Sequence, residues 1–319
     1  MNLPIIRNRK YFYSLSALLI LVSLLSLIAW GLKPGIDFTG GSLMEVSFKG
    51  NRPASSEIQQ ALADLDLGEI RVQPAGEHDF ILRFKDVEEA KHQEILAVLK
   101  DVFVLPSEIE QSDTTEIDAG KGVLTEQRFE SVGPIVGQEL KQKTWLAIFL
   151  AALMIVAYIA YAFRKVSKPV ASWKFGVAAI LALIHDILIV TGLFSLLGHF
   201  AGVEVDSLFI TALLTILGFS VHDTIVVFDR TRENLSKHYS GNFEQVVNDS
   251  INQTINRSIN TSLTTLLALF ALYFGGGDTI TNFVLALIAG MVIGTYSSIF
   301  VASPIVVSWY NIDRKLKSR

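Results

Sequence analysis

Long apolar segments alternate with polar ones along the chain, and their lengths predict an α-helical polytopic membrane protein with six transmembrane helices. About twenty residues of α-helix, rising about 1.5 Å each, cross a bilayer core of about 30 Å. The last apolar segment is longer than this, so we expect it to tilt or to project beyond the bilayer. The predicted spans cover residues 11–32, 144–163, 175–197, 208–228, 257–274 and 280–309.

The polar segment between the first two spans, residues 33–143, has the alternation and turn signals of a small external α/β domain. The order strand, helix, strand, strand, helix, strand predicts a ferredoxin-like sandwich. Residues 106–122, rich in acidic residues, threonine and glycine, are expected to form an irregular excursion. The expected elements are strands at 42–48, 69–73, 79–84 and 123–132, and helices from 53 and over 86–102.

The positions of lysine and arginine predict the orientation in the membrane. Outside residues 33–143, all of them lie in the two tails and in the connections 164–174 and 229–257, whereas the connections 198–207 and 275–279 have none. Because cytoplasmic connections carry the excess of basic residues, we expect both termini in the cytoplasm and residues 33–143 outside. The first apolar segment is too long for a signal peptide and lacks a small-x-small cleavage site, which indicates a retained anchor.

This orientation divides the chain into four parts. A cytoplasmic tail with the first span occupies residues 1–32, the external domain 33–143, a five-span domain 144–310, and a second cytoplasmic tail 311–319. Within the five-span domain we expect a cytoplasmic loop at about 229–256. Its residues 230–250 have a helical pattern of apolar positions, typical either of a helix on the membrane surface or of a solvated connecting helix.

The amino-acid composition supports a membrane protein and argues against several other classes of protein. Half of the residues are hydrophobic and the mean hydropathy is +0.43, as expected for an integral membrane protein. The chain has no cysteine, and its six histidines have no third ligand at useful spacing, so we expect no disulfide, metal or cofactor. The sequence also has no phosphate-binding glycine loop, and we expect no enzyme activity. A net charge of −4 gives no reason to expect nucleic acid binding.

The fourth span contains a carboxylate, Asp223, in an otherwise apolar stretch. A charge in a membrane span costs several kcal/mol unless it is paired, hydrated or neutralised. Small and polar residues recur at helical spacing near it, which is typical of a helix that lines a path through a bundle. They are Thr211, Thr215, Gly218 and His222, with Ser220 and Asp223 beside them.

The start of the fifth span carries polar residues that are expected to interact with Asp223, and Arg257 is the cation among them. One interpretation is that Asp223 loads and unloads protons as Arg257 approaches and withdraws, and the other is a static structural ion pair. Residues four apart stack on one helix face. The polar rows are Asn252, Asn256, Asn260 and Thr264, and beside them Gln253, Arg257, Thr261 and Thr265.

Two further polar residues lie within spans. Asp186 follows His185 in the middle of the third span, and either a proton-handling role or a neutral, hydrogen-bonded structural role fits it. His222 either relays protons or packs as a hydrogen-bonded histidine. In the sixth span a small residue recurs at every fourth position, which indicates close helix packing or a sliding surface. These small residues are Ala286, Gly290, Gly294, Ser298 and Ala302.

Five segments in order resemble the SecD/SecF family of protein-export membrane proteins, within the RND-type superfamily. They are GIDFTGGSLMEV, VGPIVGQEL, the His-Asp pair of the third span, GFSVHDTIVVFDRTREN and NQTINRSINTSLTT. The resemblance covers nearly the whole chain. SecD proteins have a much larger external region, so about 110 external residues favour the SecF side of the family.

The resemblance implies a bacterial inner-membrane subunit that pairs with SecD and assists the SecYEG channel, with YajC and an unfolded preprotein as further partners. It implies use of the proton motive force, with Asp223 and Arg257 on the proton path beside an aspartate of SecD. His222 stands where the family often has asparagine, which weakens a relay role. Gly40 and Gly41, directly after the first span, are a candidate hinge because glycine permits unusual backbone angles.

Three functions remain open from the sequence. The first is a proton-driven accessory of protein export, the second is half of an RND-type small-molecule or ion-coupled transporter, and the third is a passive scaffold of a translocation complex. Six spans make half of such a transporter, which favours a partnered subunit. A scaffold has no need to bury two charges, so Asp223 and Arg257 favour the first function over the third.

Overall fold

The computed structural model describes residues 3–49, 52–103, 123–162, 170–238 and 242–317. The chain forms two compact units, one of Pro34–Lys143 and one of Met1–Lys33 with Thr144–Arg319. Lys33 therefore belongs to the helical unit rather than to the external domain in which the sequence analysis placed it.

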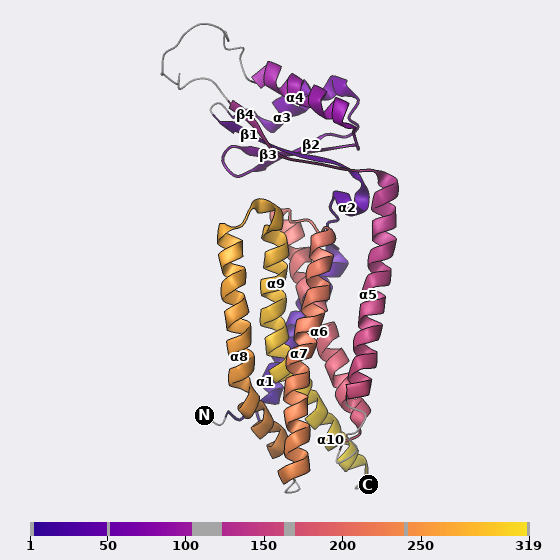
Figure 1. Ribbon diagram of the computed structural model, residues 1–319, viewed down its shortest axis with the longest axis vertical. Coiled ribbons are helices and arrows are strands. Elements are labelled where there is room, and N and C mark those ends of the chain that lie inside the picture. The colour runs from indigo at the N-terminus through magenta and orange to yellow at the C-terminus, as the bar shows by residue number, and fades with distance from the viewer. Residues whose placement is uncertain (1–2, 50–51, 104–122, 163–169, 239–241, 318–319) are drawn as a thin grey trace. The chain divides into compact units, whose positions relative to one another are not determined.

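The unit of residues 34–143 contains a four-stranded antiparallel sheet with the strand order β2-β3-β1-β4. Helices α3 and α4 lie on one face of this sheet (Figure 1). The chain order of strands and helices confirms the predicted β-α-β-β-α-β pattern. The elements are α2 (Ile36–Thr39), β1 (Gly41–Lys49), α3 (Ser55–Ala61), β2 (Arg71–Ala75), β3 (Asp79–Phe84), α4 (Glu89–Phe103) and β4 (Val123–Val132).

The alternation of apolar residues in the strands builds the core of this unit. Met44, Val46 and Phe48 of β1 are buried, as expected for positions two apart on one face of a strand. They pack with buried residues of β3 and of both helices, including Ile58 and Ile95. The predicted excursion at 106–122 lies outside the described residues.

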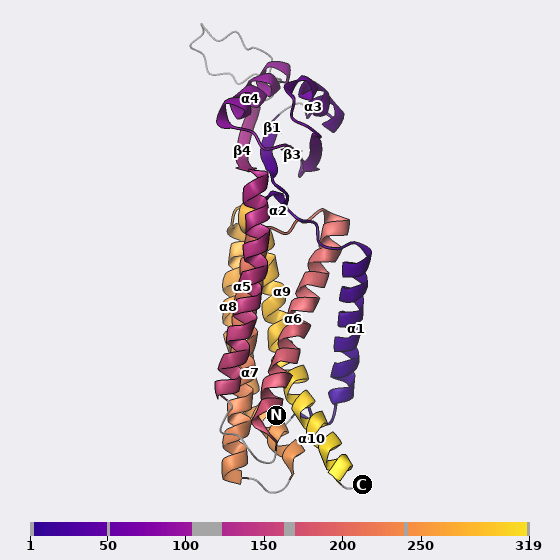
Figure 2. The same ribbon diagram turned by 90° about the vertical axis from the view of Figure 1, so that its right-hand side faces the viewer.

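The other unit contains helices long and apolar enough for six membrane spans, which confirms the predicted number. The sixth span is interrupted: α9 passes through a π-helical turn, Ser298–Ala302, into α10. Figures 1 and 2 show α6, α7 and α9 packed together in this bundle. The helices are α1 (Arg9–Ala29), α5 (Pro134–Ala162, of which the residues up to Lys143 belong to the sheet unit), α6 (Ser172–Ala201), α7 (Ser207–His238), α8 (Phe243–Gly275), α9 (Asp278–Ser297) and α10 (Ser303–Lys317).

The predicted cytoplasmic connection at about 229–256 is helical in its described residues, as the pattern over 230–250 predicted, because helix α7 continues to His238 and α8 already begins at Phe243. The intervening residues 239–241 lie outside the described part. Phe243, Val246 and Val247 are buried in the main apolar cluster of the bundle. The apolar positions that resembled a membrane-surface helix are therefore the inward face of α8.

Small residues bring the central helices into close contact, as the pattern in the sixth span predicted. A Cβ atom added to Gly290 of α9 would lie 2.2 Å from the side chain of Ile216 on α7. One added to Gly294 would lie 3.1 Å from Cβ of Ser220. Without an aqueous hydrophobic effect, such close backbone approach is a main source of attraction between membrane helices.

Candidate functional site

Helix α7 presents two different sides near the predicted acid. Asp223 is 8% exposed and lies with buried Ser220 and Thr224 toward the neighbouring helices. The predicted small and polar stripe lies on the adjacent, outward side of α7 and is exposed, so it does not line a path inside this bundle. Its members are Thr211, Thr215, Gly218 and His222.

Helix α8 repeats this arrangement. Arg257 is exposed and makes no ion pair with Asp223 within the described part of the chain, so the static ion pair is absent from this structure. The polar residues predicted to line the site are exposed on the same helix, and they are Asn256, Asn260 and Thr261.

Polar side chains on the outside of apolar spans are unfavourable against lipid. The bundle places its exposed polar residues on α7 and α8, on either side of the nearly buried carboxylate of Asp223. The exposed polar residues of α7 and α8 therefore need contact with water or with another protein surface in place of lipid. Within the described residues no group of three or more His, Asp and Glu side chains could hold a metal ion.

Asp186 is joined to a different set of residues from Asp223. Its carboxylate is 1% exposed and accepts hydrogen bonds from Ser220 of α7 at 2.5 Å and from Ser297 of α9 at 2.7 Å. Its other oxygen lies 2.8 Å from Nδ1 of His185. Asp186 thus ties three helices together, as the hydrogen-bonded structural interpretation requires, and sequence spacing alone gave no sign of either serine as a partner.

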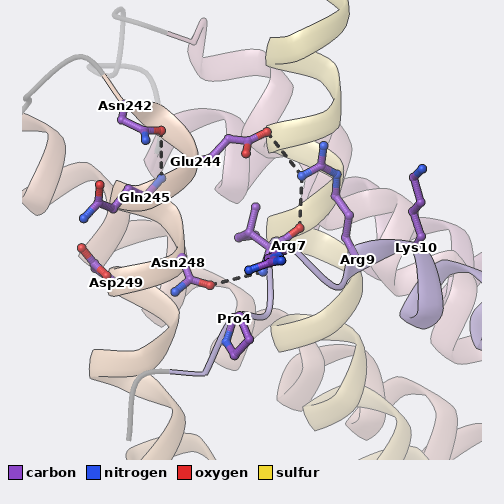
Figure 3. A pocket seen from close by; sticks show the side chains of 10 residues that line it. Pro4, Arg7, Arg9, Lys10, Asn242, Glu244, Gln245, Asn248 and Asp249 are labelled. Carbon is purple, nitrogen blue, oxygen red and sulfur yellow. Dashed lines mark hydrogen bonds and ion pairs between the residues drawn. The ribbon is translucent and has the colours of Figure 1, made fainter.

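The first residue of the predicted asparagine row has a partner that the sequence analysis missed. Asn252 forms two hydrogen bonds with the backbone of Leu3, at 2.8 and 3.0 Å. One turn earlier, Asn248 accepts a hydrogen bond from the backbone N–H of Ile6 at 3.2 Å (Figure 3). We call residues 3–8 the N-terminal strap, because they cross the start of α8 in this way.

The strap is also held by apolar burial and by charge. Ile5 and Ile6 are 3% and 2% exposed and belong to the main apolar cluster. Directly after the strap, Arg9 contacts Glu244 of α8 at 3.3 Å (Figure 3). A cavity of about 510 Å³ lies between the strap and α8, and none of the predicted site residues lines it.

The candidate hinge is a tightly packed corner. Gly40 and Gly41 have positive φ angles of 74° and 113°, which glycine adopts readily. A Cβ on Gly40 would lie 2.9 Å from Cα of Pro134 at the start of α5, and one on Gly41 would lie 2.9 Å from the carbonyl oxygen of Phe84. Backbone conformation and close contact therefore explain both glycines, and hinge motion stays a prediction.

The sequence is similar to two family profiles that together span most of the chain. The profile described as protein export membrane protein SecD/SecF, C-terminal, matches residues 113–312. The profile described as the SecD/SecF GG motif matches residues 26–51, which include Gly40 and Gly41.

Curated relatives are similar over nearly their whole length. A protein translocase subunit SecF of Thermobaculum terrenum is 46% identical, over 98% of this chain and 95% of the relative. One from Anaerolinea thermophila is 38% identical, over 96% of this chain and 94% of the relative.

Solved structures of SecDF are similar in fold. The crystal structure of SecDF from Thermus thermophilus, described as a translocon-associated membrane protein, matches 98% of this chain with a TM-score of 0.77 and 32% identity. A SecDF in a super-membrane-facing form matches with a TM-score of 0.67 and 31% identity. This chain spans 39% and 40% of the length of those two chains.

Proposed function

The chain belongs to the SecD/SecF family of protein-export membrane proteins, and we propose that it works with a SecD partner to couple the proton motive force to protein export. It is an accessory subunit of the Sec protein translocase, a multi-pass membrane protein with six spans. In the proposal the partner complex acts at the SecYEG channel, with YajC as an associated component, and moves an unfolded preprotein.

The observation that carries this proposal is the exposed polar side of α7 and α8 beside Asp223. These two helices are apolar enough to span a membrane, yet each has a stripe of polar residues on the outer surface of the bundle. The stripes contain Thr211 and His222 on α7, and Asn256 and Arg257 on α8. A SecD subunit that covers these stripes would exclude lipid and enclose Asp223 in a polar path between the two subunits. The matched SecDF chains, which are much longer than this one, support such a pairing.

In this path Asp223 is the proton carrier and Arg257 is the group that changes its proton affinity. With Arg257 close, the charged carboxylate is favoured and the proton leaves, whereas with Arg257 withdrawn the desolvated carboxylate takes a proton up. His222, exposed on the adjacent turn, is placed to exchange protons at the mouth of the path. Asn260 and Thr261, exposed on α8, supply polar groups to the same region, whereas the buried hydroxyl of Ser220 donates to Asp186.

The free energy available is large enough for a conformational step. One proton moving down a potential of about 100 mV delivers about 2.3 kcal/mol. That amount changes a two-state equilibrium by about fifty-fold. We propose that the helices rock between two arrangements, and that Gly40 and Gly41 absorb part of the motion where the chain leaves α2 and enters β1.

The basic residues support the proposed orientation. The N-terminal strap and the ends of α7 and α10 carry lysine or arginine, and we propose that both termini are cytoplasmic and that residues 34–143 are outside. The bacterial inner membrane is the proposed location, with the sheet unit on the periplasmic side where an emerging preprotein is handled.

Export in membrane vesicles tests this proposal. Vesicles would carry SecYEG, the SecD partner and this chain, and completed preprotein translocation would be measured with and without a proton gradient. Asp223→Asn should remove the stimulation by the gradient, because the amide takes up no proton. Asp229→Asn is the matched control, since it removes a carboxylate from the exposed end of the same helix and should leave stimulation unchanged.

Two other outcomes would point to the other functions. If Asp223→Asn leaves gradient stimulation intact at equal abundance, the chain is a scaffold. If the variant abolishes proton-coupled movement of small molecules while export is unaffected, the chain is half of a small-molecule transporter.

A further inference from the structure

Asp186 lies apart from the exposed stripes and is the most fully buried acid described in the helical unit, at 1% exposure. It accepts one hydrogen bond from α7, through Ser220, and one from α9, through Ser297, both on Oδ2. A carboxylate oxygen that accepts two hydroxyl groups fixes both donors in direction as well as in distance. The buried carboxylate is therefore a joint between these two helices.

A second set of hydrogen bonds clamps the same turn of α7. The hydroxyl of Ser298 donates to the carbonyl oxygen of Ser220 at 3.2 Å and lies 2.8 Å from the hydroxyl of Thr224. Asp223 lies between Ser220 and Thr224 in the sequence. The Ser298 hydroxyl, in the π-helical turn that follows α9, therefore holds the turn with the proposed proton carrier at both ends, through the carbonyl oxygen of Ser220 and the hydroxyl of Thr224.

The clamped part of α9 is also the place where its backbone changes. The π-helical turn begins at Ser298, directly after Ser297, and α10 follows it. Such turns are rare, contain an extra residue and are often found at functional sites. Gly294, one turn earlier, permits the approach, since a Cβ there would lie 3.1 Å from Cβ of Ser220.

From this geometry we propose that Asp186 is a positioning residue for Asp223. It acts as a hydrogen-bond acceptor that holds Ser220 to Ser297, and it is not itself a station on the proton path. This inference rests on the proposed role of Asp223 as proton carrier. Of the two roles that the sequence left open for Asp186, this inference selects the structural one over proton handling. The hydrogen bonds of Asp186 then matter for function because they position Asp223.

The surroundings of the two carboxyl groups differ in the way this role requires. The titratable groups near Asp186 are His185 on its own helix and Tyr296 on α9, whose ring centre lies 6.2 Å from that of His185. Those acting on Asp223 are His222 and Arg257, which are exposed. Asp223 thus adjoins the surface from which protons arrive, and Asp186 lies behind it among hydroxyl groups.

Asparagine and alanine substitutions at position 186 distinguish a positioning role of Asp186 from a role as proton carrier. Asparagine keeps an oxygen that accepts both serine hydroxyls but carries no titratable proton, whereas alanine removes the acceptor. We expect Asp186→Asn to retain most proton flux and Asp186→Ala to lose at least about ten-fold. Ser220→Ala and Ser297→Ala should each reproduce part of the loss, because each removes one donor of the joint.

The readout is the protonation of Asp223 itself. A hydrophobic carbodiimide modifies protonated carboxyl groups in membranes, and mass spectrometry of the peptide that contains Asp223 reports its modification as a function of pH. In membranes that contain the SecD partner, Asp186→Ala should shift the midpoint of this profile by about one pH unit, because the released turn of α7 changes the surroundings of the Asp223 carboxylate. Asp186→Asn should leave the midpoint near that of the wild type.

Ser195→Ala is the matched control. Ser195 is a buried serine on the same helix as Asp186, and its hydroxyl donates to the carbonyl oxygen of Gly31, far along α6 from the joint. It should leave both the midpoint and the flux unchanged. A midpoint shift in this control would overturn the proposal, because it would show that any lost buried hydroxyl alters Asp223.

The proposal also fails if asparagine and alanine at position 186 abolish flux equally while the Asp223 profile stays in place, since Asp186 would then carry protons. Failure of the proposed function looks different. In that case Asp223→Asn would leave flux and export intact, whereas the labelling midpoint of Asp223 in the Asp186 variants would still report whether the joint positions it.

Discussion

Replacing Gly290 with alanine tests the close packing of α7 and α9 that supports the site. The new Cβ would lie 2.2 Å from Cδ1 and Cγ1 of Ile216 and 2.8 Å from its Cγ2. Carbon atoms in contact are normally about 3.5–4.0 Å apart. Because both γ carbons of Ile216 are too close, rotation of its side chain does not relieve the clash, and the helices must move.

The expected destabilisation is about 1–3 kcal/mol, the usual range for an extra methyl group in a packed core. Ile216 is 3% exposed, and Ile216→Ala alone should destabilise by about 2–5 kcal/mol. The double variant should be more stable than the sum of the two changes by about 1–3 kcal/mol, because the alanine at 290 then occupies part of the vacated space.

Unfolding of the purified chain by SDS in mixed micelles, followed by circular dichroism, would measure these differences. Gly218→Ala is the matched control, since no atom lies within 4 Å of the added Cβ and alanine favours the helix. If Gly290→Ala is as stable as the wild type, or if the two changes simply add, then α7 and α9 are not in the contact that the structure shows.

Three further predictions concern other parts of the chain. Asn252→Ala should release the N-terminal strap and raise protease cleavage before Arg9 by about ten-fold, whereas Asn260→Ala should not; equal cleavage of the two variants would refute the docking. Gly40→Ala should destabilise the sheet unit by about 1–3 kcal/mol in thermal unfolding, because of its positive φ and the contact with Pro134, and an unchanged midpoint would contradict this. Hydrogen bonds from Gln93 and from His92 hold the pKa of Glu89 below its usual 4.5. Their stabilisation is present above that value and is lost as the pH falls through the lower, folded pKa. Acid should therefore lower the protection factors of α4 near Glu89, taken relative to the intrinsic exchange rate at each pH, in the wild type but less in Glu89→Gln.

The periodicity of the sequence predicted which residues share a helix face but not which face is inside. Thr211, Thr215, Gly218 and His222 do lie on one side of α7, yet that side is exposed. In a membrane span, polar residues that line an internal path and polar residues that wait for a second subunit produce the same pattern. Only the packing of the other helices distinguishes the two.

Helix lengths and side-chain partners show the other limit. Hydropathy located all six spans, but α7 and α8 continue beyond the apolar part, because polar amphipathic turns extend a helix without extending the hydrophobic stretch. The spacing of Asn252 correctly placed it on a polar face, but its partner is the backbone of Leu3, which lies 249 positions away. Partners of this kind, like Ser220 and Ser297 for Asp186, depend on which helices meet.

Gly40 and Gly41 were predicted to have unusual backbone angles, but conformational freedom is only part of the reason for glycine at these positions. The sequence analysis selected them for their conformational freedom, and the structure shows positive φ angles at both. Contact with Pro134 and Phe84 is the additional constraint, and it could not be predicted because it joins the start of β1 to the start of α5 and to the end of β3.

Proton flux through reconstituted vesicles would show whether Asp223 carries protons between this chain and its SecD partner. A pH-sensitive dye inside the vesicles would report proton entry under an imposed membrane potential, for this chain alone, for the chain with its SecD partner, and for the pair carrying Asp223→Asn. The account predicts flux only in the wild-type pair, because Asp223 carries the proton and the exposed stripes of α7 and α8 form a path only when covered. Equal flux in the pair with Asp223→Asn, or in the chain alone, would contradict it.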